Sequence, residues 1–155
     1  MAAPAIGHLI CSMALVALIL VMPSFFVMER NSIAEEMALR ELTEIADYTS
    51  STLENLFLLA NSTNSGELTI TKDLFYLPQK VDGSPYVLEI SSVDNVTASQ
   101  VTAYLTDRSW VAGTSWLVPD LKITAQDSLI VSDFTVEVGC KRDATGFYVW
   151  IGKGE

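Results

Sequence analysis

The chain has 155 residues, half of them hydrophobic, and carries a net charge of −10 from 19 acidic and 9 basic residues. Nucleic acid and anionic lipid headgroups bind clustered lysines and arginines, so this acidic balance argues against both as partners. The two cysteines, Cys11 and Cys140, belong to no CxxC pair and no cysteine–histidine cluster, so neither a disulfide framework nor a zinc site is predicted.

The first element is an apolar stretch, residues 6–28, without any Asp, Glu, Lys or Arg. A helix needs about 20 apolar residues to cross the hydrocarbon core of a bilayer, and this stretch is long enough. A secretory signal peptide has a basic start and an apolar core of about 7–15 residues, and a soluble core helix has a polar face. We therefore expect a retained membrane helix. The residues that represent its membrane or assembly surface are Ile6, Leu9, Leu15, Leu18, Pro23, Phe25 and Phe26.

Residues 31–60 continue the helix with a different pattern. Apolar positions recur at steps of three and four residues, which is the periodicity of one helix face. No Gly or Pro interrupts the chain between Ser24 and Thr63, and Pro23 is expected to kink the helix at most. The stripe either covers the head domain of the same chain or packs on neighbouring copies, and periodicity does not separate these alternatives. The stripe includes Ala38, Leu42, Ile45, Leu53, Leu56 and Ala60.

Residues 61–66, Asn-Ser-Thr-Asn-Ser-Gly, form a cluster of turn residues and predict a linker. Beyond it the apolar period drops to two, which is typical of strands. The expected strands are 67–72, 86–90, 100–106, 109–111, 121–124, 129–138 and 146–151, with breaks that include Ala112-Gly113 and Gly139. The last two strands, with 139–146 between them, are expected to form a terminal hairpin.

Seven short strands separated by turn residues predict an antiparallel sandwich. The expected fold class is α+β, in three parts. Residues 1–60 form a helix with its membrane span at about 6–28, 61–66 the linker, and 67–155 a β-sandwich head.

Aromatic side chains in the head are candidate contact residues. Strand alternation places Phe147, Val149 and Ile151 on one face of the last strand and two aromatic residues on the other. A strand with two apolar faces covers the core with one face and meets a helix or a partner with the other, and exposed apolar patches mark interfaces. The candidates are Trp110, Trp116, Tyr148 and Trp150.

Chemistry is sparse in the sequence. The only histidine, His8, lies in the apolar stretch, away from the head. No nucleophile elbow, phosphate-binding loop, zinc-protease motif or EF-hand occurs. Cys140 precedes Lys141 and Arg142, which would lower the pKa of its thiol, but an ordinary loop cysteine is the simpler interpretation. We expect a protein that is not an enzyme and binds no cofactor.

The side of the membrane is indicated by conflicting signals. Asn61 and Asn95 each begin an Asn-x-Thr acceptor for glycosylation, which would place the head outside the cell. Arg30 and Arg40 follow the apolar stretch, while no Lys or Arg precedes it, so the positive-inside rule alone would place the head in the cytoplasm. We favour an extracellular head, against the arginine count.

An uncharged apolar helix, its amphipathic continuation and a β head together resemble the type IV pilin superfamily. The archaeal branch is the most similar, with archaellins, adhesive pilins and the membrane-anchored β-sandwich stator proteins of the archaellum. Pro23 resembles the helix-breaking residues of pilin helices, and the opening Ile-Gly-His-Leu-Ile at 6–10 is similar to those of archaeal members. The resemblance implies a cell-surface filament subunit whose helices bundle in the core, through contacts between copies that do not close.

Two features favour an alternative. Residues 1–6 contain no Lys or Arg, unlike the basic leader of processed archaeal pilins, and the glutamate near the start of bacterial mature pilins is missing. An uncleaved helix resembles the stator proteins instead. The expected partners are therefore other copies in a helical homo-oligomer or, for a permanently anchored binding module, an envelope protein such as the surface layer. Both alternatives involve a membrane.

Overall fold

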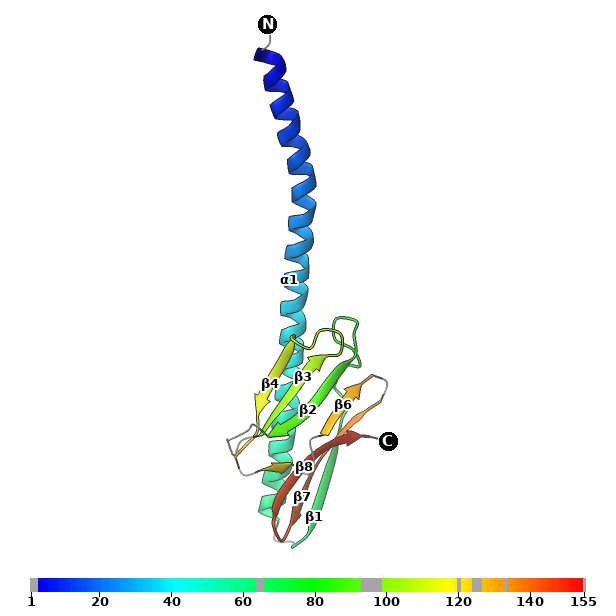
Figure 1. The fold of residues 1–155 in the computed structure, drawn as a ribbon. Helices are drawn as coiled ribbons and strands as arrows, with labels where there is room; N and C mark the ends of the chain where they lie inside the picture. The colour runs from blue at the N-terminus through cyan, green and yellow to red at the C-terminus, as the bar shows by residue number, and fades with distance from the viewer. Residues whose placement is uncertain are drawn as a thin grey trace. The chain divides into compact units, whose positions relative to one another are not determined.

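The computed structural model describes residues 3–63, 66–92, 99–119, 121–123, 127–132 and 134–154. Within these residues the chain has one α-helix followed by eight β-strands (Figure 1). It divides into two compact units, Met1–Glu36 and Met37–Glu155. The first unit is helical throughout its described residues, whereas the second combines the rest of the helix with all of the strands.

Helix α1 runs from Ala3 to Ser62, which confirms the expected long apolar helix at the N-terminus. Pro23 lies inside it without ending it. The helix ends at Ser62, inside the turn-residue cluster 61–66, and the hydroxyl groups of Ser62 and Thr63 donate to the carbonyl of Leu59 (2.8 and 2.9 Å). Such bonds from side chains to the backbone satisfy carbonyls that have no partner at the end of a helix.

The strands form two four-stranded sheets, ordered β1-β7-β8-β5 and β4-β3-β2-β6. All pairings are antiparallel except that of β5 with β8. The expected head of mostly antiparallel strands is confirmed, and its description as a sandwich stays a prediction. The strands are β1 Leu68–Leu74, β2 Tyr86–Ser92, β3 Ser99–Leu105, β4 Ala112–Trp116, β5 Lys122–Ile123, β6 Asp127–Val131, β7 Val136–Asp143 and β8 Gly146–Lys153.

Two expected strands are wrong. Residues 109–111 form a turn, closed by a bond from the Val111 N–H to the Arg108 carbonyl (2.9 Å), and the strand begins one residue later. The expected strand 129–138 is two strands, because β6 pairs with β2 in one sheet and β7 pairs with β1 and β8 in the other. The chain changes sheets between them.

Gly139 is also not a break but the middle of β7, where it pairs with Trp150 on β8. A Cβ atom at position 139 would lie 2.4 Å from the Trp150 ring, so glycine leaves the space in which the indole covers the strand. The expected terminal hairpin is confirmed, but its connection is only 144–145 rather than 139–146, because β7 continues to Asp143. Asp143 holds it by accepting bonds from the N–H groups of Thr145 and Gly146.

The core of the second unit lies between the helix and the inward faces of the two sheets. From the strands it includes Leu88, Ile90, Val101, Ala103, Val138, Cys140, Val149 and Ile151, all buried. From α1 it includes Ala38, Leu42, Ile45, Leu53, Leu56 and Ala60, which are the stripe of the sequence. Thr49 lies in the same stripe, and its buried hydroxyl donates to the carbonyl of Ile45 (2.8 Å).

Candidate functional site

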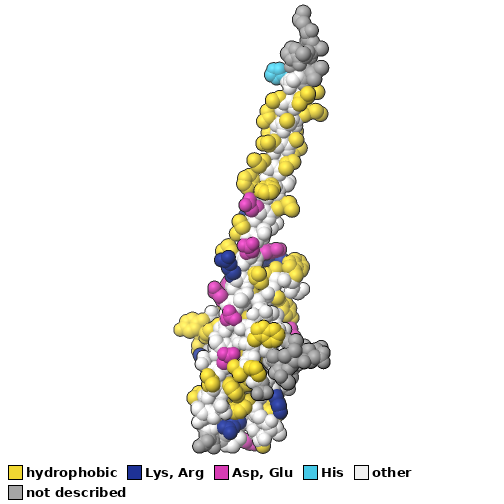
Figure 2. Space-filling model, turned by 90° about the vertical axis from the view of Figure 1, so that its left-hand side faces the viewer, with side chains coloured by type: hydrophobic (Ala, Val, Ile, Leu, Met, Phe, Trp, Pro, Cys, Tyr) yellow, Lys and Arg dark blue, Asp and Glu magenta, His cyan; other side chains and the backbone are white. Residues whose placement is uncertain are grey.

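The apolar half of α1 is the most unusual surface of the first unit. Its large apolar side chains are all exposed, from 48% at Met22 to 72% at Met28. Figure 2 shows hydrophobic side chains, in yellow, along the length of this segment. Exposed apolar patches of this extent are typical of protein–protein or membrane interaction sites. By length and composition this helix could cross a membrane, a property that it shares with signal sequences near an N-terminus.

The structure places the expected surface residues of this segment in that exposed region. Leu9, Leu15 and Leu18 are 64%, 57% and 56% exposed, and Phe25 and Phe26 are 64% and 62% exposed. The side chain of Ile6 lies outside the described residues. Together with the other exposed apolar residues of 9–28 they surround the helix, so the segment has no polar side to turn toward water.

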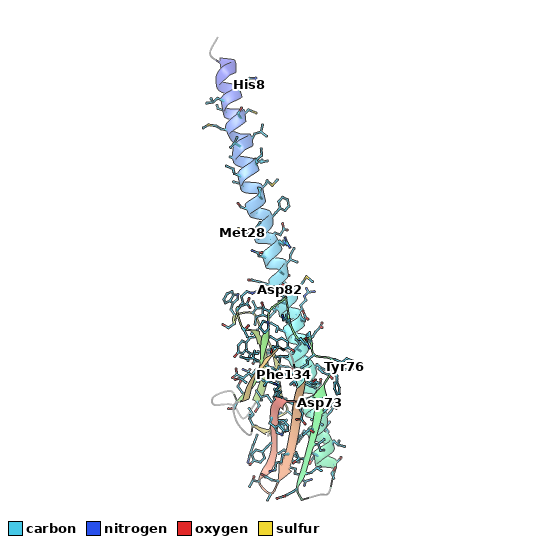
Figure 3. The ribbon with its side chains drawn as sticks, turned by 90° about the vertical axis from the view of Figure 1, so that its right-hand side faces the viewer. His8, Met28, Asp73, Tyr76, Asp82 and Phe134 are labelled. Carbon is cyan, nitrogen blue, oxygen red and sulfur yellow. The ribbon has the colours of Figure 1, made fainter. Side chains whose placement is uncertain are left out.

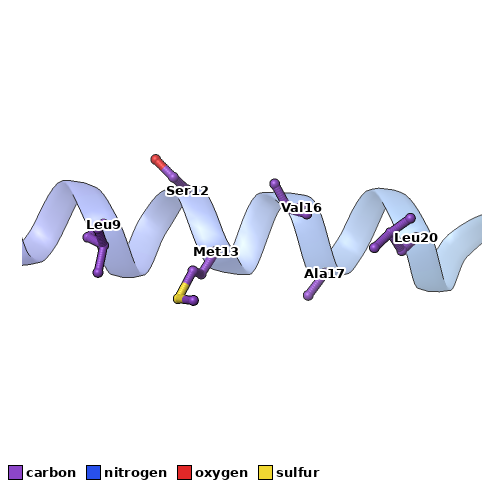
Figure 4. Close-up of a pocket in the computed structure, with 6 residues that line it drawn as sticks. All are labelled: Leu9, Ser12, Met13, Val16, Ala17 and Leu20. Atoms are coloured by element: carbon purple, nitrogen blue, oxygen red, sulfur yellow. The ribbon is translucent and has the colours of Figure 1, made fainter.

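One face of this segment carries an open groove of about 450 Å³ (Figure 4). The lining residues are Leu9, Ser12, Met13, Val16, Ala17 and Leu20. The single polar side chain among them is satisfied internally, because the Ser12 hydroxyl donates to the carbonyl of His8 (2.8 Å). The groove therefore offers only apolar contact, which suits a lipid chain or another helix.

The stripe residues lie elsewhere. Leu42, Ile45, Leu53 and Leu56 are at most 6% exposed and form part of the core of the second unit. Of the two alternatives for the stripe, the structure therefore shows it against the strands of its own chain. These four residues do not form a free assembly surface.

Close backbone contact fixes α1 on the sheet β4-β3-β2-β6. A Cβ atom at Gly113 would lie 2.3 Å from the backbone nitrogen of Thr43, so β4 touches the helix backbone where glycine stands. The Ser50 hydroxyl donates to the carbonyl of Trp116 at the end of the same strand (2.8 Å). The sequence indicated a break at Ala112-Gly113, because a local glycine signal does not reveal a tertiary contact.

Arg142 holds the C-terminal end of the helix, and sequence reasoning did not identify this role. Its guanidinium donates to the carbonyls of Thr63 (2.7 Å) and Ala60 (3.4 Å). It also lies over the ring of Phe147 (5.4 Å), which meets Phe57 of the helix edge-to-face (4.8 Å). A cation at a helix C-terminus is favoured by the helix dipole and the unpaired carbonyls. No sequence motif predicts this pairing.

The four aromatic candidates in the head do not meet in one groove. Trp110 (72% exposed) lies in the turn before β4, and Trp116 (58% exposed) ends that strand. Tyr148 and Trp150 are half-buried on β8, in the other sheet. The Tyr148 hydroxyl is hydrogen-bonded to the Thr145 hydroxyl (2.7 Å), and the Trp150 ring covers Gly139.

The remaining candidates are the two glycosylation acceptors and the thiol of Cys140. Asn61 is exposed in the last turn of α1, and Asn95 lies outside the described residues. Cys140 is a buried residue of β7, and burial raises the pKa of its thiol. The interpretations of a loop cysteine and of an activated thiolate are therefore both wrong, because burial disfavours the charged form.

A second open groove, of about 380 Å³, lies in the second unit beside Tyr76 (Figure 3 labels this residue). Glu41 and Glu44 contribute carboxylates to it, while the other lining residues are Ile45, Tyr48, Tyr76, Leu77 and Pro78. Among the residues that the structure describes, no group of three or more His, Cys, Asp or Glu side chains could hold a metal ion.

Comparison with protein-family models, with curated proteins and with solved structures finds no match for this chain.

Proposed function

We propose that the chain is a non-catalytic structural subunit of an extracellular pilus-like or archaellum-like filament that assembles through its N-terminal helix. The observation that carries the proposal is the apolar segment 9–28, whose large side chains are exposed around the helix. Covering one such side chain gains about 1.5–3 kcal/mol, so the segment is strongly driven out of water. A bilayer covers it before assembly, and a bundle of the same helices covers it in the filament.

The burial of the stripe supports a division of roles along the helix. Leu42, Leu53 and the other stripe residues complete the core of the head within one chain. The head then needs no neighbour to fold, and contacts between copies come from the apolar segment and from head surfaces. Such contacts join different patches on the two copies, so repeated contacts add further copies to an open filament and do not close into a ring.

A second candidate function is a permanently anchored binding module whose head grips an envelope protein. Exposed aromatic side chains on the head favour it, since aromatic anchors dominate binding at protein interfaces. These residues are Phe75 (74% exposed), Tyr76 (88%), Trp110 (72%) and Trp116 (58%).

Immunogold electron microscopy of native cells, with an antibody to the head, tests the proposal. Labelled surface filaments that contain a chain shortened at its N-terminus are the expected result. Label confined to the membrane fraction, with an intact N-terminus by sequencing, would contradict it and support the anchored module.

Matched aspartate variants locate the assembly surface. Leu15 in the apolar segment is 57% exposed and Leu58 in the later part of α1 is 60% exposed. A charge in the middle of an apolar segment costs about 2.5–3.5 kcal/mol of membrane insertion, so Leu15→Asp should abolish filaments. Leu58→Asp should preserve them, and equal loss in both variants would count against assembly through the apolar segment.

A further inference from the structure

The groove beside Tyr76 in the second unit brings carboxylates and aromatic rings together. Glu41, Glu44 and Tyr48 line it from one face of α1, and Tyr76 lines it from the segment that follows β1. Figure 3 shows Tyr76 beside the helix. The groove is open to solvent and holds about 380 Å³, which is at the small end for ligand sites.

The walls of the groove are held in place by the fold. Ile45, at its helix side, is buried in the core (4% exposed). On the other side the carbonyl of Pro78 accepts a bond from the Tyr86 hydroxyl (2.9 Å), and the N–H of Leu77 donates to the carbonyl of Leu74 (3.4 Å). The lining residues are therefore carried by a helix and by a closed turn, so the groove is formed before a ligand enters it.

The polar groups of the groove are unpaired. Among the residues that the structure describes, the carboxylates of Glu41 and Glu44 form no ion pair, and the hydroxyls of Tyr48 and Tyr76 form no hydrogen bond. Arg40 precedes Glu41 but is exposed outside the groove. Like charges about one helical turn apart repel each other, so a cation between these carboxylates would relieve the repulsion.

This chemistry suits an arginine side chain. The planar guanidinium donates to carboxylates through its fork of N–H groups and stacks on tyrosine rings, and a lysine ammonium lacks that fork. Its apolar stem packs on side chains such as Ile45 and Leu77. A metal ion requires more ligands than two carboxylates, and the described residues contain no group of three His, Cys, Asp or Glu that could hold one. An apolar ligand would leave both carboxylates unpaired.

We propose that this groove binds an arginine side chain presented by a partner protein, with the guanidinium between Glu41 and Glu44 and its plane against Tyr76. Charge complementarity selects the partner, because a chain with a net charge of −10 attracts a basic surface and repels a second copy of itself. This binding goes beyond the proposed structural role. It holds equally for a filament subunit and for an anchored module, so a failure of either proposal leaves the other standing.

NMR titration of the full chain in detergent micelles tests the proposal, with acetyl-Gly-Arg-Gly-amide as the probe. The amide signals of Glu44, Tyr48 and Leu77 should shift together and saturate at millimolar peptide. The same peptide with citrulline, the neutral isostere of arginine, should not produce these shifts. High salt should weaken the binding of the arginine peptide, because it screens an exposed ion pair.

Matched variants locate the site. Glu44→Gln should weaken binding of the arginine peptide by about twofold to fivefold, which is the contribution of an exposed ion pair. Asp47→Asn removes the same charge from an exposed residue of α1 outside the groove and should leave binding unchanged. Tyr76→Leu should also weaken binding, because it removes the stacking surface. Phe75→Leu, at the neighbouring exposed ring (74%), is its control.

Thermal unfolding by circular dichroism accompanies each variant, and the four melting temperatures should equal that of the wild type because the substituted side chains are exposed. Equal shifts with the arginine and citrulline peptides would overturn the proposal. Equal weakening in Glu44→Gln and Asp47→Asn would overturn it too, since it would mark a general attraction to an acidic chain. Self-association that Glu44→Gln abolishes, without any change in peptide binding, would assign the groove to a contact between copies and contradict the proposed partner.

Discussion

Both halves of α1 are rich in apolar residues, but they differ in charge and in how their apolar side chains are buried. Between residues 9 and 28 the helix has no Asp, Glu, Lys or Arg, and its large apolar side chains are exposed on all faces. Between 38 and 60 the helix has one buried apolar stripe, while Glu41 and Glu44 remain exposed, as does Leu58 outside the stripe. The difference teaches that the distribution of charge around a helix, rather than its apolar content, indicates what covers it.

The largest expected effect contrasts one leucine from each half. Leu42→Ala leaves a cavity in the core and should lower the free energy of unfolding of the head by about 3–4 kcal/mol. Leu18→Ala changes an exposed side chain and should leave that free energy unchanged. Urea unfolding of the full chain in detergent, followed by tryptophan fluorescence, measures both. A comparable loss in the two variants would break the distinction between the halves.

A glycine pair sharpens the same comparison. Gly113→Ala places a Cβ atom against the backbone of Thr43, and such overpacking should cost about 2–3 kcal/mol because backbone atoms do not yield as a side chain tip does. Gly7→Ala meets nothing within 4 Å and should leave head stability unchanged. The same unfolding assay measures both variants, and a stable Gly113→Ala protein would show that β4 does not rest on the helix.

Arg142 stabilises the C-terminal end of α1. Arg142→Met keeps much of the apolar stem but removes the bonds to the carbonyls of Ala60 and Thr63. The expected loss of unfolding free energy is about 1–2 kcal/mol, from a charged hydrogen bond at a helix C-terminus. Lys141→Met, on the neighbouring exposed residue, is the control and should change stability by less than about 0.5 kcal/mol. Amide exchange should rise in the last turn of α1 in the first variant only.

The smallest expected effect is a dependence on alkaline pH within the second half. Burial, followed by the nearby Glu41 carboxylate, raises the pKa of Tyr86, whose hydroxyl donates to the carbonyl of Pro78 (2.9 Å). The unfolded chain releases this proton at the ordinary value of about 10, where the folded chain still holds it. Stability is therefore fully present below pH 10 and falls as the pH rises above it. In Tyr86→Phe this fall should be smaller, and an identical fall in both proteins would assign it to other groups.

Local patterns predicted much of this fold. The long helix follows from the apolar run and the spacing of Leu42, Ile45 and Leu53, and β2 and β8 follow from alternating residues that begin at Tyr86 and Gly146. Strand pairing was out of reach, because it depends on contacts distant in the sequence. The chain leaves one sheet for the other after Val131, within what looked like a single strand.

The features that the sequence did not predict are the roles of two glycines, the partner of the apolar stripe and the role of Arg142. Gly113 and Gly139 had the local signature of breaks, yet each admits a neighbouring group, the helix backbone in one case and the Trp150 ring in the other. The stripe could be located but not assigned to a partner, since periodicity says which face is apolar and not what meets it. The role of Arg142 follows only from where the β7–β8 hairpin lies beside the helix end.

Sedimentation of the full chain with and without detergent tests most directly whether the apolar half of α1 needs lipid or other copies. In detergent the chain should sediment as a dispersed species with a folded head. Without detergent it should pass into membranes or into large assemblies, while Leu15→Asp should shift toward the soluble fraction. A wild-type chain that stays monomeric in detergent-free buffer, with residues 9–28 protected from protease, would contradict the account.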